Sequence, residues 1–201
     1  MCSQAEVMSE LPSAFADEIE VAMRLARSAG ARILEHYENA QSVDIDYKDG
    51  DRSNPVTAAD TDANALIVEG LRAAFPNDAV LAEESPDSES RHQRRRLWCV
   101  DPLDGTQEFI NRNGEFVVMI GLAVDGEARM GVVYQPTTDE LFWGAQNSAA
   151  MIKNGVSSRL GPSRVAEPAS ARLSISRSHR SATVDRVARA LGTTHETACG
   201  S

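Results

Sequence analysis

Apolar side chains in the first third of the chain recur every three or four positions, a spacing that is typical of amphipathic helices. One such helix is predicted over roughly residues 15–38, where charged residues separate the apolar positions Phe15, Ile19, Ala22, Met23, Ala26, Ile33, Leu34 and Tyr37. A polar and acidic stretch follows over 41–54. The helical spacing returns over 63–74 and is ended by Pro76. The pattern therefore predicts two helices ahead of the rest of the fold.

Beyond residue 76 the pattern changes to short apolar runs, rich in Val, Ile and aromatic residues, that predict strands. These runs cover residues 79–82, 97–100, 116–124, 130–134, 141–144 and 149–152. Asp125-Gly126 and Asn154-Gly155 are hairpin turn signals. A series of strands that follows a pair of helices favours an α+β layered fold over alternating βαβ units.

The pattern changes once more near the C-terminus. The segment 157–170, which is rich in Ser and contains two prolines, is the predicted boundary between two units. After it, a strand-like run at 173–176 and helical spacing over 184–191 indicate a second unit. We therefore expect an α+β domain over residues 1–160 and the start of an α/β domain over residues 171–201.

The composition is that of a globular protein, with 201 residues of which 42% are hydrophobic and 25% charged. No apolar run approaches the roughly 18 residues needed to span a bilayer. The N-terminus also lacks the apolar core of a secretory signal, so we expect a cytoplasmic protein. A formal net charge of -10 argues against binding to a nucleic acid polymer. The spacing of Cys2, Cys99 and Cys199 supports neither a disulfide framework nor a zinc site.

One motif carries the strongest chemical signal. A short apolar strand leads into two carboxylates, Asp101 and Asp104, and a Gly105-Thr106 pair then opens a predicted short helix. Mg²⁺ prefers carboxylate and carbonyl oxygens and completes its octahedral shell with water and substrate phosphate. Asp101, Asp104 and the Leu103 carbonyl would supply such ligands. The amides of Gly105 and Thr106 would receive phosphate oxygens. The alternative from the spacing alone is an Asp-Pro turn in which Asp104 caps a helix.

Two further acidic motifs precede this one in the chain. Glu83 and Glu84 stand at the end of a predicted strand, where they are either solvated or part of a metal cluster at the same edge of the sheet. Thr57, followed three residues later by Asp60, is typical of a capping box at the start of a helix. As part of a site, Asp60 would instead accept a proton from Thr106, whose hydroxyl would orient an attacking water.

Residues 103–106 also resemble the nucleophile loop of haloacid-dehalogenase-type phosphatases. In that loop the nucleophilic aspartate lies two residues before a second aspartate. Asp104 would be the second aspartate here, and the position of the nucleophile is taken by Pro102, which has no carboxylate. A route through an aspartyl-phosphate is therefore disfavoured.

Three motifs, in this order and spacing, resemble the lithium-sensitive, Mg²⁺-dependent phosphatases related to inositol monophosphatase. They are Asn54-Pro55-Val56-Thr57-Ala58-Ala59-Asp60, Ala82-Glu83-Glu84-Ser85 and Val100-Asp101-Pro102-Leu103-Asp104-Gly105-Thr106-Gln107-Glu108-Phe109. Within that family, residues 108–110, 112–116 and 174–179 look most like the bacterial 3′(2′),5′-bisphosphate nucleotidases, which remove the 3′-phosphate of adenosine 3′,5′-bisphosphate, a by-product of sulfate assimilation. The resemblance implies a layered α/β/α/β/α sugar-phosphatase fold, in which the N-terminal antiparallel-sheet domain is complete and the C-terminal α/β domain has only begun.

The resemblance also implies a site that holds two or three Mg²⁺ ions. Glu83 and Asp101, with the Leu103 carbonyl, would hold the first ion, and Asp101 and Asp104 would hold the second. Two cations would clamp the attacking and leaving oxygens of an in-line displacement without a covalent intermediate. Cations rather than basic side chains would then neutralise the charge of the substrate, which agrees with the acidic composition.

Asp60 and Thr106 would form the catalytic pair that accepts a proton from the attacking water. The residues implied to contact the substrate are Glu83, Leu103, Asp104, Gly105 and Thr106. The expected substrate is a small 3′-phosphorylated nucleotide, and the alternative is an inositol or sugar monophosphate, because the same metal machinery serves both. The resemblance also allows a homodimer.

Members of the family continue beyond the position of Ser201 with a Trp-Asp-x-Ala-Ala motif, whose aspartate ligates the second metal. Trp98 and Trp143 are the only tryptophans of this chain, and neither precedes an aspartate. We therefore expect a C-terminally truncated chain whose second metal site lacks one ligand. An inactive remnant of the family is the alternative to an active enzyme.

Overall fold

The computed structural model describes residues 14–39, 45–47, 55–177 and 180–200. The chain divides into two compact units, Met1–Leu160 and Gly161–Ser201. Cys2, one of the three cysteines, lies outside the described residues.

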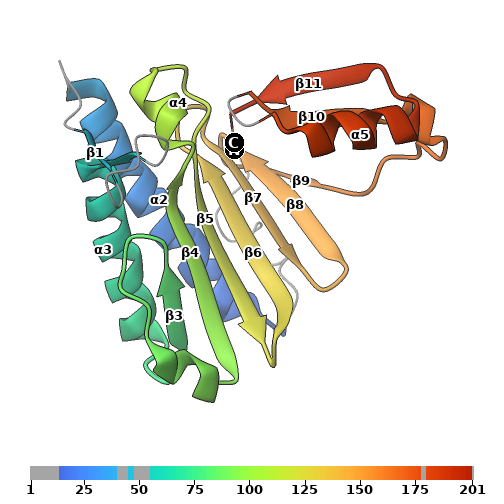
Figure 1. Cartoon of the computed structure of the whole chain (residues 1–201). Helices are drawn as coiled ribbons and strands as arrows, with labels where there is room; N and C mark the ends of the chain where they lie inside the picture. Colours follow the sequence, from blue (N-terminus) through green and yellow to red (C-terminus); the bar gives the residue numbers. More distant parts are fainter. Residues whose placement is uncertain (1–13, 40–44, 48–54, 178–179, 201) are drawn as a thin grey trace. The chain divides into compact units, whose positions relative to one another are not determined.

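The larger unit is built on a seven-stranded sheet (Figure 1). In order across the sheet, the strands are β3 (Ala79–Ala82), β4 (Arg96–Asp104), β5 (Val117–Val124), β6 (Glu127–Gln135), β7 (Glu140–Ala145), β8 (Ser148–Lys153) and β9 (Val156–Arg159). β3 and β4 are parallel, and each later pair is antiparallel. The sheet is therefore mixed, with a parallel pair at one edge.

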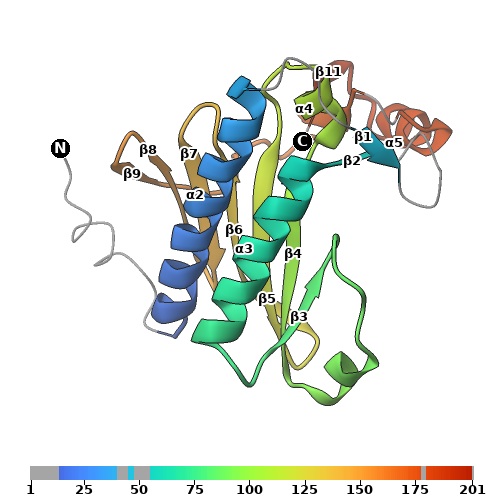
Figure 2. The same ribbon diagram turned by 90° about the vertical axis from the view of Figure 1, so that its left-hand side faces the viewer.

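Two long helices cover one face of this sheet. α2 (Ala16–Asn39) and α3 (Ala58–Ala74) lie side by side in front of the strands in Figure 2. The shorter elements of the unit are the antiparallel pair β1 (Ile45–Tyr47) and β2 (Pro55–Thr57), the 3₁₀ helix η2 (Glu89–Gln93) and the helix α4 (Thr106–Ile110). Among the described helices, none is long and apolar enough to cross a membrane.

The core lies between these helices and the sheet because side chains alternate between the two faces of a strand. On β5, Val118, Ile120 and Leu122 are buried, whereas Met119 between them is 38% exposed on the opposite face. The helices contribute apolar stripes that complete the core. The pattern of hydrophobic positions thus decides which face of the sheet the helices cover.

A cluster of polar and aromatic contacts joins the beginning of β4 to both helices. Trp98 is fully buried, stacks on Phe75 at the end of α3 with 5.1 Å between ring centroids, and donates from Nε1 to Asp78 at 3.0 Å. Arg96 donates to Asp78 and to Glu18 on α2. β4 is therefore anchored before it reaches the carboxylates at its far end.

The smaller unit contains a β-α-β crossover, which is the connection that parallel strands need. Its elements are the 3₁₀ helix η3 (Pro168–Ser170), β10 (Arg172–Ser176), α5 (Ala182–Leu191) and β11 (His195–Cys199). β10 and β11 are parallel. Ser181 caps α5 by accepting a hydrogen bond from the Val184 amide at 3.4 Å, and Gly192 ends the helix with a φ of 68°.

The α+β fold class is confirmed, and the two helices and six strands lie where the hydrophobic pattern predicts them. The helix predicted over 63–74 begins earlier, at Ala58, because Thr57 donates from its amide to the Asp60 carboxylate and starts the first turn. The pattern does not predict β1 and β2, which flank a polar stretch without apolar alternation. It also misses β9, a four-residue strand of which three residues are polar.

The packing of Tyr134 against α2 gives a test of this arrangement. A Cβ atom at Gly30 would lie 2.5 Å from Cε1 of Tyr134 and 3.1 Å from Cβ of Pro136. Replacing glycine by alanine inside a helix ordinarily adds about 1 kcal/mol of stability. We expect Gly30→Ala instead to lower the free energy of unfolding by about 1–2 kcal/mol, because the added methyl overpacks the core.

The measurement is urea denaturation, and Ser28→Ala on the exposed face of the same helix is the matched control. The control should change the free energy of unfolding by less than about 0.5 kcal/mol. A Gly30→Ala variant more stable than the parent would show that the Tyr134 ring does not pack against α2.

Candidate active site

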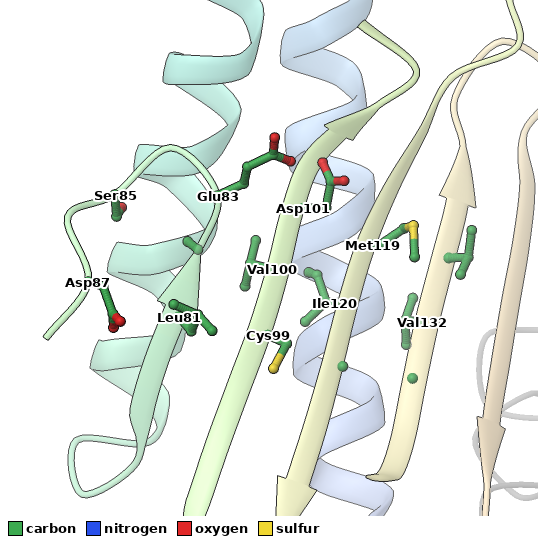
Figure 3. Close-up of a pocket in the computed structure, with 14 residues that line it drawn as sticks. Leu81, Glu83, Ser85, Asp87, Cys99, Val100, Asp101, Met119, Ile120 and Val132 are labelled. Carbon is green, nitrogen blue, oxygen red and sulfur yellow. The ribbon is translucent and has the colours of Figure 1, made fainter. Parts of the chain in front are cut away.

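The carboxyl ends of β3 and β4 lie at the same edge of the sheet because the two strands are parallel. Glu83 directly follows β3, and its amide donates to the Val100 carbonyl of β4 at 3.1 Å. This hydrogen bond places Glu83 beside Asp101, the next residue of β4. Figure 3 shows the carboxylates of Glu83 and Asp101 directed toward each other.

A register shift in β4 separates the two aspartates of the central motif. Asp101 pairs with Met119 of β5, and Asp104 pairs with Val117, so three steps on β4 match two on β5. Pro102 has no N–H to donate to the ladder, and the Leu103 amide donates to the Asp101 carboxylate at 3.2 Å. β4 is therefore irregular between the two aspartates, although both still pair with β5.

The chain turns sharply after Asp104. Gly105 has a φ of 96°, a conformation that is open to glycine and strained for other residues. The turn leads directly into α4, which begins at Thr106. The Gly105 amide, one of those expected to receive phosphate, donates to the Asp104 carboxylate in this structure.

Asp60 and Thr106 come together from distant parts of the chain. Asp60 is 2% exposed in the first turn of α3. Its Oδ2 accepts hydrogen bonds from the amide and hydroxyl of Thr57 at 2.8 and 2.6 Å. Its Oδ1 accepts from the Thr106 hydroxyl at 3.1 Å, and that hydroxyl also lies 3.2 Å from the Leu103 carbonyl. The capping box and the contact with Thr106 therefore coexist.

The site concentrates negative charge that has been partly removed from water. Burial and the neighbouring carboxylates of Glu83 and Asp104 raise the pKa of Asp101 to about 7. Burial, followed by the charges of Glu83 and Glu108, raises the pKa of Asp104. Burial also raises the pKa of Asp60, although its hydrogen bonds from Thr57 and Thr106 act in the opposite direction.

The donor chemistry of this edge suits a hard divalent cation. Carboxylates from Glu83, Asp101 and Asp104 interact electrostatically, and the Leu103 carbonyl lies in the same segment. Oxygen donors of this kind are the ligands that Mg²⁺ takes, and the raised pKa values reflect negative charge that a cation would compensate. In the described part of the chain, no three acidic, His or Cys side chains are already close enough to enclose a metal ion.

The fold brings further polar residues to this region, and among them only Asn64 lies outside the motifs singled out in the sequence. Glu108, on α4, is 4% exposed, and its charge helps to raise the pKa of Asp104. The charge of Glu84 also helps to raise the pKa of Asp60. Asn64, on α3, donates to Ser85 beyond the end of β3. Helical spacing places Asn64 on the same face as Asp60, but its partner depends on the tertiary fold.

A groove lies on the face of the sheet opposite α2 and α3, with a volume of about 660 Å³ (Figure 3). Its walls are mainly apolar and include Leu81, Met119 and Val133. Glu83 and Asp101 also line it, so the groove adjoins the carboxylates of the candidate site.

Comparisons with known proteins agree with the motifs. Residues 16–199 match the model of the inositol monophosphatase family. The 3′(2′),5′-bisphosphate nucleotidase CysQ of Salmonella typhimurium is 39% identical over 184 residues, which are 91% of this chain and 73% of that protein. The crystal structure of CysQ from Bacteroides thetaiotaomicron, a bacterial member of the inositol monophosphatase family, is similar with a TM-score of 0.70 and 29% identity, over 92% of this chain and 73% of that one.

A second crystal structure supports the fold alone. The extragenic suppressor protein SuhB of Bartonella henselae matches with a TM-score of 0.77 and 24% identity, over 92% of this chain and 71% of that chain. The arrangement of helices and sheet is therefore shared with solved proteins.

The buried charge at Asp101 makes the stability of the cation-free chain depend on pH. Its ordinary pKa is 3.8 and its pKa in the folded chain is about 7, so the folded state holds a proton that the unfolded state releases. The folded chain therefore loses stability as the pH rises from about 4 to 7. In EDTA at pH 8, we expect Asp101→Asn to melt at a higher temperature than the parent, with a difference that shrinks as the pH is lowered toward 4.

Asp125→Asn is the control for this measurement by thermal denaturation. Asp125 pairs with Arg95 on the surface, and this ion pair lowers its pKa, so its replacement should give no gain in melting temperature at pH 8. A gain for Asp101→Asn that is the same at pH 8 and pH 4 would rule out titration of Asp101 as its cause.

Proposed function

Because the chain belongs to the inositol monophosphatase family, we propose that it is a Mg²⁺-dependent phosphomonoesterase that removes the 3′-phosphate of adenosine 3′,5′-bisphosphate. The observation that carries the proposal is the hydrogen bond from Thr106 to the buried Asp60 carboxylate, next to the carboxylates that follow β3 and lie in β4. The substrate is taken from the relatives named as bisphosphate nucleotidases, which are about 40% identical to this chain.

The family is generally Mg²⁺-dependent, and the proposed ligands are Glu83, Asp101, the Leu103 carbonyl and Asp104. Bound Mg²⁺ would neutralise the charge of the substrate phosphate and that of the carboxylates. The ligands come from the turn after β3 and the irregular end of β4, so the sheet holds both segments at one edge. The proposed substrate contacts are Glu83 and residues 103–106.

Thr106 and Asp60 would handle the proton of the attacking water. The Thr106 hydroxyl donates to Asp60 and so keeps lone pairs with which to accept a hydrogen bond from water. As water attacks phosphorus, its proton passes to Thr106 Oγ1 while the hydroxyl proton passes to Asp60 Oδ1. The bond between phosphorus and the 3′-oxygen then breaks, inorganic phosphate is released, and the leaving 3′-oxygen takes up a proton from solvent to become the 3′-hydroxyl. The raised pKa of Asp60 makes it a stronger base for this step.

The fixed geometry of Asp60 suits this role. Thr57 occupies Oδ2 with two hydrogen bonds, which leaves Oδ1 to Thr106. The carboxylate therefore cannot rotate without losing bonds at the start of α3. Asp60 would thus be preorganised as a proton acceptor and would also stabilise the helix.

Removal of the proton acceptor tests the mechanism. Asp60→Asn keeps an acceptor oxygen for the capping box but takes up no proton. We expect it to lower kcat by about 10²–10⁴-fold, and we expect Thr106→Ser, which keeps the hydroxyl, to retain most activity. The assay is phosphate release at saturating Mg²⁺, with Asp125→Asn as the control outside the site. An Asp60→Asn variant as active as the parent would exclude Asp60 as the acceptor.

Substrate preference tests the other part of the proposal. Purified full chain is assayed with adenosine 3′,5′-bisphosphate and with myo-inositol 1-phosphate, with and without EDTA. We expect the higher kcat/KM for the nucleotide and loss of activity in EDTA. A preference for the inositol ester would assign the chain to the inositol or sugar monophosphatases, and a folded chain inactive on both would indicate a non-catalytic relative.

A further inference from the structure

Asn64 is a buried amide on α3 that the proton-transfer pair does not use. It is 7% exposed and lies one helical turn after Asp60. Its Nδ2 donates to the Ser85 hydroxyl at 2.9 Å. Its Oδ1 is buried and accepts no hydrogen bond from the described residues. A buried amide with an unpaired acceptor lowers stability relative to an apolar side chain, so stability alone does not account for Asn64.

Ser85 belongs to the turn that carries Glu83. The Ser85 amide donates to the Ala82 carbonyl at 3.1 Å, and the Glu83 amide donates to the Val100 carbonyl at 3.1 Å. The first bond closes the turn and the second attaches it to β4. Figure 3 shows Glu83 directed toward Asp101 and Ser85 on the opposite side of the same turn.

We infer that Asn64, acting through Ser85, is a positioning residue that orients the Glu83 turn for binding of the divalent cation. The inference rests on the proposed function, because Glu83 is a ligand only in that proposal. Groups that orient metal ligands through a hydrogen bond affect metal affinity although they do not touch the ion. Asn64 acts one step further away, through the backbone of the turn.

The position of Asn64 on α3 links the two parts of the site. Asp60 and Asn64 are four residues apart and lie on the same face of one rigid helix. Asp60 accepts a hydrogen bond from Thr106 at the start of α4, and Asn64 donates one to Ser85 in the turn after β3. One helix therefore fixes the positions of both the proposed proton acceptor, Asp60, and the turn that carries the proposed metal ligand, Glu83.

The test removes both partners of the hydrogen bond. In the full chain carrying Asn64→Leu and Ser85→Ala, no polar group of this pair remains buried, so the melting temperature should equal or exceed that of the parent. Titration calorimetry with MgCl₂ alone should give a Kd about ten-fold weaker than that of the parent. kcat at saturating Mg²⁺ should stay close to the parent value. Ser85→Thr, which keeps the hydroxyl, should bind Mg²⁺ as the parent does.

Val68→Ala is the matched control, because Val68 is buried on the next turn of the same helix and its loss lowers stability without touching Ser85. If Val68→Ala weakens Mg²⁺ binding as much as the double variant, the effect is a general one and the inference is wrong. Unchanged Mg²⁺ affinity in the double variant overturns the inference while leaving the proposed function intact. A folded parent that binds no Mg²⁺ overturns both.

Discussion

Removing the Asp101 carboxylate from water beside Glu83 and Asp104 is the constraint on which the rest of the structure depends. The pKa of Asp101 rises to about 7 because burial and like charges both disfavour the ionised form. The surrounding fold must therefore hold these groups together against their repulsion. It does so with a fully buried apolar core next to the site, in which Leu103 and Phe109 are part of the same short segment as the aspartates.

At Asp60, the structural role of capping a helix coincides with the proposed role as proton acceptor. Its carboxylate caps the first turn of α3, where an acid is favoured by the helix dipole, and one oxygen of the same group meets Thr106. A pattern that is typical of a capping box and a pattern that indicates catalysis are therefore compatible at one residue. The same holds for Asp104, whose carboxylate accepts from the amide of the following glycine while it adds to the charge of the site.

Much of this could be predicted from the sequence because the signals are periodic or local. The spacing of apolar residues locates α2, α3 and most strands. The segment around Asp101 contains, within four residues, the carboxylates and the carbonyl that are proposed to bind Mg²⁺. The contact between Asn64 and Ser85 could not be predicted, since it joins residues 21 positions apart without any repeating pattern. The strands β1 and β2 were equally hidden, because the polar stretch beside them carries no alternation. Both features depend on hydrogen bonds to residues that are distant in the sequence, which local patterns do not reveal.

The register shift between Asp101 and Asp104 makes the number of residues in this segment as important as their identity. Three steps on β4 match two on β5, and Gly105, with its positive φ, then turns the chain into α4. Deletion of one residue between the aspartates would leave two steps on β4 against two on β5, which is a regular ladder without the irregular segment that now separates them. A substitution here changes one side chain, whereas a change of length would move the carboxylates, the Leu103 carbonyl and the Gly105 turn relative to one another all at once.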